Sequence, residues 1–260
     1  MNKQINLSNY FSTLAAACLL LAGASAQAAT NWAASYGGCG DSGNVVAAAG
    51  SFGTCGSSGV EVRATSIISS SITDATVRAW SGGLGVQNVN ESNTNGPHAL
   101  DNASGLDALI FKFTEAVSLT SLTLGWNGHD NAVSSGGVSY NDSDVSIYAW
   151  TGASATPTSY ASSVAGWVLI GDYFNVGTQS GNTQGVSTPV FSSYWLVSAY
   201  GAGSTSTTDA FKVLSLAGTY CGALCAPPGS DVPEPGSLAL MAMGAFGLMA
   251  ARRRQKIPVV

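Results

Sequence analysis

Apolar and polar residues alternate along the middle of the chain. From Val60 to Thr65 every second residue is apolar, which is the period-2 pattern of a half-buried β-strand. Glycine in Ser81-Gly82-Gly83 predicts a hairpin there, and the polar Glu115 predicts a second turn. Further strands are predicted in segments rich in Val, Leu, Phe and Thr, at residues 75–80, 84–89, 109–114, 117–126, 145–149, 166–174, 190–200 and 210–217.

Many short strands joined by Gly-, Asn- and Ser-rich segments, without a convincing amphipathic helix, predict an all-β fold. We expect an antiparallel β-sandwich, jelly-roll-like, that forms an ectodomain over residues 29–218. Within it, the Gly-rich residues 29–59 are expected to be mostly loop, with one short strand near residues 44–49. A parallel β-helix would need a fixed repeat period, which the sequence lacks.

Both ends of the chain carry apolar runs without alternation. Lys3, the apolar residues 11–22 and the small-residue site Ala26-Gln27-Ala28 predict a secretory signal peptide and its helix over residues 1–28. The uncharged residues 238–251 predict a second hydrophobic helix, which is short for a bilayer core that needs about 20 residues. Arg252, Arg253 and Arg254 follow it and favour a cytoplasmic position for that end.

The segment before this second helix contains Val232, Pro233, Glu234 and Pro235. Each proline fixes its own φ and disfavours helix in the residue before it, so the segment should be an extended strip that a protease can bind. A Pro-Glu-Pro motif, a hydrophobic helix and an arginine cluster, in this order, resemble the C-terminal sorting signal of exosortase substrates, the PEP-CTERM proteins. We therefore expect a Cys-, Pro- and Gly-containing spacer over residues 219–231 and a sorting signal over residues 232–255.

The resemblance implies a protein that is exported through the inner membrane of a Gram-negative bacterium. Exosortase, an integral-membrane cysteine protease, would cleave it near the Pro-Glu-Pro motif, so its insertion in the membrane would be transient. The final location would be the cell surface or the extracellular matrix. An ordinary single-pass anchor with a chance Pro-Glu-Pro is the alternative.

A narrower resemblance, to a subgroup of exosortase-dependent surface proteins, rests on blocks within the predicted ectodomain. It implies surface display and brings no catalytic residues. The blocks are residues 97–102, 107–113, 125–126, 142–152, 194–197 and 209–215.

The chain carries a net charge of −5, which argues against nucleic acid as a partner because phosphates would be repelled. Of its five cysteines, Cys18 lies in the predicted signal peptide. Export favours disulfides among the rest, and we expect Cys39 to pair with Cys55 and Cys221 with Cys225, although other pairings are formally allowed. Zinc bound by the last two is the weaker alternative, because no histidine lies near them.

Acidic and amide side chains gather around three predicted strand ends. Carboxylate and amide oxygens in glycine-containing loops are ligands that calcium prefers, so we expect a structural calcium site. The alternative is that these residues terminate strands and shape turns. The proposed ligands are Asp101, Asn102, Asp107, Asp130, Asp142 and Asp144.

Taken together, these features predict a structural component of the cell surface or of a biofilm matrix, associated with exopolysaccharide and without enzymatic activity. One alternative is a glycan-binding module, in which Trp126 and Trp150 would stack on sugar rings. A secreted hydrolase that uses His98 or His129 is less favoured, since nothing in the sequence selects a nucleophilic serine.

Overall fold

The computed structural model describes residues 31–56, 59–91, 98–103, 105–127, 133–135, 138–140, 143–177, 182–201 and 209–225. Within these ranges the only helix is a short 3₁₀ turn, η1 (Gly222–Cys225), and the prediction of an all-β fold is therefore confirmed. The predicted signal helix and C-terminal helix lie outside the described residues. The strands belong to a compact unit that ends at Gly222, and a second unit comprises Ala223–Val260.

All strand pairs in the described residues are antiparallel. The strands are β1 (Asn31–Ser35), β2 (Asn44–Ala47), β3 (Gly53–Thr54), β4 (Glu61–Ile68), β5 (Ser71–Trp80), β6 (Gly83–Gln87), β7 (Leu100–Asp101), β8 (Leu106–Asn127), β9 (Val133–Ser135), β10 (Val138–Tyr140), β11 (Ser143–Trp150), β12 (Trp167–Val176), β13 (Thr183–Gly185), β14 (Ser192–Ala199) and β15 (Ala210–Tyr220).

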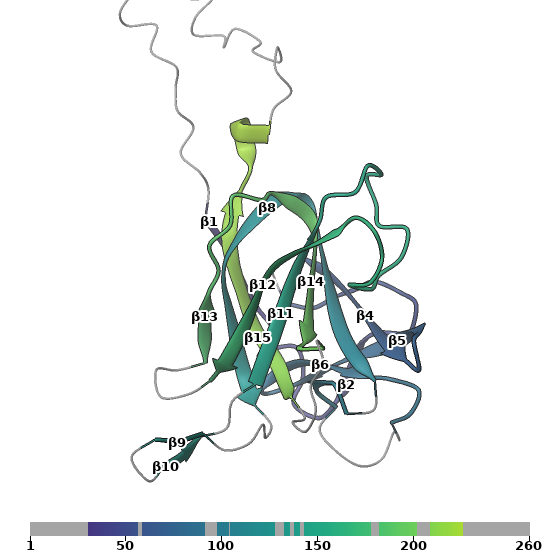
Figure 1. Ribbon diagram of the computed structural model, residues 1–260, viewed down its shortest axis with the longest axis vertical. Helices are drawn as coiled ribbons and strands as arrows, with labels where there is room; N and C mark the ends of the chain where they lie inside the picture. The colour runs from purple at the N-terminus through teal and green to yellow at the C-terminus, as the bar shows by residue number, and fades with distance from the viewer. Residues whose placement is uncertain are drawn as a thin grey trace, which may run out of the picture. The chain divides into compact units, whose positions relative to one another are not determined.

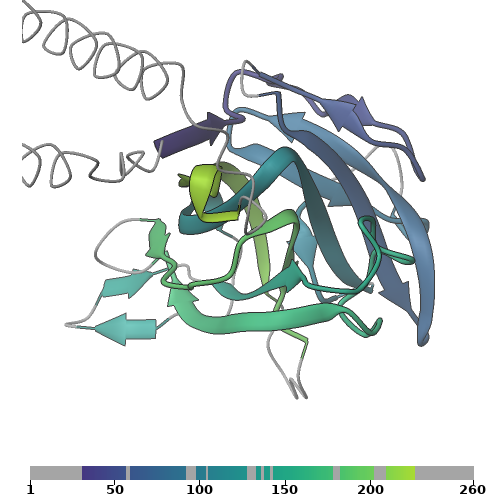
Figure 2. The same ribbon diagram turned by 90° about the horizontal axis from the view of Figure 1, so that it is seen from above.

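One large sheet contains most of these strands, in the order β1-β15-β6-β5-β4-β8-β14-β11-β12 (Figure 1). Because β15 also pairs with β8, the strands β15, β6, β5, β4 and β8 close into a small barrel. Figure 2 shows the sheet curving round the core of this unit. The finer assignment, a jelly-roll-like sandwich, stays a prediction.

Strand β8 is continuous over 22 residues, so the predicted turn at Glu115 with two paired flanking strands is wrong. The first half of β8 pairs with β4 and β14, and the second half pairs with β15 and β13. Thr114-Glu115-Ala116 contains no glycine or asparagine, the residues that give a tight hairpin its positive φ. The strand instead arches over one end of the barrel (Figure 1), which brings both of its ends to the opposite side.

The other predicted hairpin is confirmed, since β5 and β6 pair with Trp80 opposite Gly83. Gly83 has φ +109°, and a Cβ there would lie 2.2 Å from the carbonyl oxygen of Val213. Glycine is therefore required both for the turn and for the close approach of β15.

The N-terminal part of the unit contains more strand than the sequence predicts. Besides β2, which was expected, β1 pairs with β15 and β3 pairs with β4. Cys39 and Cys55 form a disulfide with a Cα–Cα distance of 5.5 Å, as predicted. Cys221 and Cys225 are disulfide-bonded as well.

Two hydrophobic clusters make up the core. The larger lies inside the curved sheet and contains fully buried residues such as Phe111, Trp195 and Phe211. The smaller contains Trp150 and Trp167, whose rings pack edge to face with centroids 5.5 Å apart.

Candidate functional site

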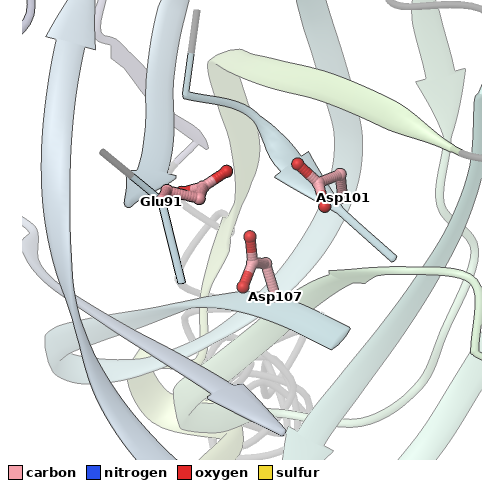
Figure 3. A group of neighbouring side chains, drawn as sticks. All are labelled: Glu91, Asp101 and Asp107. Atoms are coloured by element: carbon pink, nitrogen blue, oxygen red, sulfur yellow. The ribbon is translucent and has the colours of Figure 1, made fainter. Parts of the chain in front are cut away.

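Three carboxylates meet where β6, β7 and β8 come together. Glu91 follows the end of β6, Asp101 ends β7, and Asp107 lies near the start of β8. One oxygen from each lies within 4.8 Å of the others. Figure 3 shows that the three side chains point toward one another. We call Glu91, Asp101 and Asp107 the acidic cluster.

Asn88 organises two of these carboxylates. Its side-chain amide donates a hydrogen bond of 3.1 Å to Asp107 Oδ1, and its backbone N–H donates one of 3.0 Å to Glu91 Oε2. The Asn88 side-chain oxygen in turn accepts a hydrogen bond of 2.9 Å from the backbone of Asn90. The turn after β6 therefore holds Glu91 in place through a buried asparagine.

The side chains of Asp107 and Glu91 differ in burial, and burial changes the pKa of each. Asp107 is completely buried, and Glu91 has 16% of its side chain exposed. Burial, together with the charges of Asp101 and Glu91, raises the pKa of Asp107 to about 8. Burial and the charge of Asp101 raise the pKa of Glu91 to about 7. Without a compensating cation, Asp107 and Glu91 therefore tend to hold protons near neutral pH.

The predicted calcium ligands divide between this cluster and a second polar group. Asp101 and Asp107 belong to the acidic cluster, with Glu91, which sequence reasoning did not include. Asn102 and Asp144 instead contact the buried Asp209: the Asn102 amide donates to Asp209 Oδ2 at 3.0 Å, and the Asp144 backbone N–H donates to Asp209 Oδ1 at 2.8 Å. Asp130 and Asp142 lie outside the described residues.

The second polar group has the properties of a structural junction. Asp209 also donates its backbone N–H to Asn102 Oδ1 at 3.0 Å, and Asn102 donates to the carbonyl oxygen of Tyr200. Asp144 Oδ1 accepts the backbone N–H of Asn175, which has φ 56°. These contacts join the ends of β7, β11, β12, β14 and β15, which is the turn-shaping role that the alternative interpretation assigns to Asp and Asn.

Glu91 could have been found from the sequence by one signal. The polar residues Asn90 and Glu91 directly follow the strand predicted at residues 84–89, and Asp107 lies two residues before the strand predicted at residues 109–114. In an antiparallel sheet, the end of one strand lies beside the start of its neighbour. The sequence did not show that the end of β6 and the start of β8 lie at the same end of a closed barrel.

A pocket of about 340 Å³ adjoins the acidic cluster, because Glu91 and Asn88 belong to its lining. Its charged and polar side chains come from β5 and from the end of β6. They are Asp74, Thr76, Arg78, Gln87, Asn88 and Glu91.

The histidine and tryptophan candidates have distinct environments. His98 is buried, lies with Nδ1 3.3 Å from Glu91 Oε2 and packs against the ring of Trp80. Trp150 is 8% exposed and fills the smaller core cluster, whereas Trp126 is 36% exposed. His129 lies outside the described residues.

The residues predicted for sorting and topology, Val232, Pro233, Glu234, Pro235, Arg252, Arg253 and Arg254, also lie outside the described residues. Within the described part of the chain, no helix has the length and the apolar character that crossing a membrane requires.

Comparison with known proteins gives a clear match to a family model and a distant similarity to solved structures. No curated protein matches the chain. A solved mutant of the Ruminococcus gnavus GH29 fucosidase in complex with fucose is 9% identical, with a TM-score of 0.29 over 62% of this chain and 25% of that one. The chain thus spans a quarter of that enzyme's length, and a likeness this weak supports no conclusion.

The clear match concerns the segment with the Pro-Glu-Pro motif. Residues 231–254 match the family model described as the PEP-CTERM protein-sorting motif. This range contains the Pro-Glu-Pro motif, the apolar run and the three arginines from which the resemblance was drawn. The chain is therefore a protein that carries the PEP-CTERM sorting motif.

Proposed function

We propose that this chain is a structural protein of the surface or extracellular matrix of a Gram-negative bacterium, associated with its exopolysaccharide or biofilm. The match of residues 231–254 to the PEP-CTERM sorting motif carries the proposal, because this motif supports exosortase-dependent sorting of an exported protein. An all-β unit with disulfide-bonded cysteines suits an oxidising location outside the cytoplasm.

In the proposed pathway the apolar run inserts in the inner membrane with Arg252 to Arg254 in the cytoplasm. Exosortase then cleaves near Val232 to Pro235, where the two prolines favour an extended conformation. The β unit leaves the membrane after this cleavage, and the protein acts without catalysing a reaction.

Mass spectrometry of the mature protein from host cells, with and without exosortase, tests the proposal. We expect a C-terminus near Pro233 in the parent strain and an intact arginine tail in nearly all molecules of the strain without exosortase. A Glu234→Ala variant should shift the parent strain toward the uncleaved form. An intact tail in both strains would mean a plain membrane-anchored protein and would contradict the proposal.

A glycan-binding module is the second candidate, and the half-exposed Trp126 favours it. Lys212 Nζ lies 4.7 Å from the centroid of the Trp126 ring and 4.6 Å from that of Trp80, and this contact holds the indole in a defined orientation. An oriented, partly exposed aromatic ring suits stacking on a sugar. The buried Trp150 does not offer such a face.

Retention on a column of the host exopolysaccharide tests this second function. If Trp126 binds the glycan, Trp126→Ala should weaken retention by roughly tenfold, the loss typical of a central aromatic contact. Phe174→Ala is the control, since Phe174 is 54% exposed on a different strand, the edge strand β12. Equal retention of both variants and the parent protein would exclude a role of Trp126 in glycan binding.

A further inference from the structure

We propose that the acidic cluster of Glu91, Asp101 and Asp107 binds one calcium ion, which joins the end of β6 to β7 and to the start of β8. The inference is independent of the sorting signal. It rests on the spacing of the three carboxylates, on an unpaired buried oxygen and on the charges around them.

The spacing fits calcium. Calcium binds oxygen at about 2.3–2.6 Å, so ligands on opposite sides of the ion stand about 4.6–5.2 Å apart. The three carboxylate oxygens lie within 4.8 Å of one another, so a single ion can contact all of them. Magnesium requires a nearly regular octahedron of ligands, whereas calcium accepts irregular sets of six to eight oxygens, so a site built from three carboxylates on separate elements suits calcium better. Ligands that are all oxygens also disfavour zinc, which prefers nitrogen and sulfur.

Acidic residues often gather at protein surfaces without an ion, but Asp107 is not at the surface. Its exposed fraction is 0%, and its Oδ2 atom has no hydrogen-bond partner among the described residues. The Ser66 hydroxyl, opposite Asp107 in the β4–β8 pairing, lies near this carboxylate and acts to lower its pKa, although no hydrogen bond of normal geometry joins the two within the described part of the chain. A buried carboxylate oxygen without a partner is costly, and a bound cation would remove that cost.

The basic side chains near the cluster make contacts with other groups as well. His98 contacts Glu91, but burial, Arg78 and Lys212 lower the pKa of this histidine, so its ring is largely neutral near pH 7. Arg78 donates hydrogen bonds to Gln87 and to the carbonyl oxygen of Gly43. Lys212 lies over the rings of Trp80 and Trp126. A divalent ion in the cluster would balance the carboxylates directly.

The ion would also explain how β7, which is a very short strand, is held in the sheet. β7 has two residues, and it pairs with β15 only through Ala210 and Phe211. Asp101, at its end, would be tied by the ion to Glu91 and Asp107 on the neighbouring elements. We therefore expect calcium to raise the stability of this whole end of the barrel.

Calorimetric titration with CaCl2 alone, on protein purified from its host and freed of metal with EDTA, tests the proposal. We expect one site, with an affinity in the range of about 10⁻⁴–10⁻³ M that is common in extracellular modules. At 10 mM CaCl2 the Tm should rise by roughly 3–10 °C. The same concentration of MgCl2 should give a clearly smaller rise.

Two variants assign the site. Asp107→Asn and Glu91→Gln each remove one charged ligand while keeping the shape of the side chain, and both should abolish the calcium-dependent rise in Tm. Glu115→Gln, an exposed acid on the same strand β8, is the matched control and should respond like the parent protein. No heat of binding and no Tm change in the parent protein would overturn the proposal, as would a full response in both variants.

Discussion

Trp195→Ala should lower the free energy of unfolding by about 3–5 kcal/mol, the usual cost of truncating a buried aromatic residue. Trp195 is completely buried on β14, which lies between β8 and β11. Its ring nitrogen donates to the carbonyl oxygens of Val117 and Ser192, at 3.2 and 3.1 Å. The variant loses apolar contacts, leaves a cavity and removes this donor from the bend of β8.

Thermal and urea unfolding measure this effect. For a unit of this size the Tm should fall by roughly 10 °C or more. Phe174→Ala removes an aromatic ring from the exposed edge strand β12 and should cost below about 1 kcal/mol. If the two variants lost the same stability, Trp195 would not be a central part of the core.

In EDTA, the protein should be more stable at pH 5 than at pH 8, because the folded state raises the pKa of two carboxyls. The pKa of Asp107 rises from 3.8 to about 8 and that of Glu91 from 4.5 to about 7. Between these limits the folded state holds protons that the unfolded chain has released, so stability falls as pH rises. The loss is roughly 1 kcal/mol per pH unit for each such proton, and the Tm should drop by roughly 10 °C or more between pH 5 and pH 8.

Asp107→Asn separates this effect from the other titrations around the cluster. His98, with its lowered pKa, acts in the opposite direction near pH 6, whereas Lys212, whose pKa is lowered to about 8, stays charged over most of the range. In EDTA, the Tm of Asp107→Asn relative to that of the parent protein should therefore rise from pH 5 to pH 8, because only the parent protein loses stability as Asp107 ionises. A constant difference would show that Asp107 does not titrate in this range. If calcium binds at the cluster, added calcium should reduce the difference in Tm between the two proteins at pH 8.

Local sequence patterns were enough to predict many of the strands and one of the two expected hairpins. Alternation predicts the strands around Val62 and Val77, because a half-buried strand needs an apolar residue at every second position. The β5–β6 hairpin follows from glycines that permit a positive φ. The turn expected at Glu115 failed, because an exposed acid in a strand can mark a bend between two sets of partners as readily as a hairpin.

The sequence by itself determined the all-β class, the Cys39–Cys55 disulfide and the sorting motif, since each depends on residues close together in the chain. The tertiary structure alone decided which acids meet. Asp101 and Asn102 are neighbours in sequence, but β7 ends at Asp101 and Asn102 lies in a bend, so one faces Glu91 and Asp107 while the other contacts Asp209. The closure of the barrel through β8 and β15 sets these distances, and no local pattern encodes it.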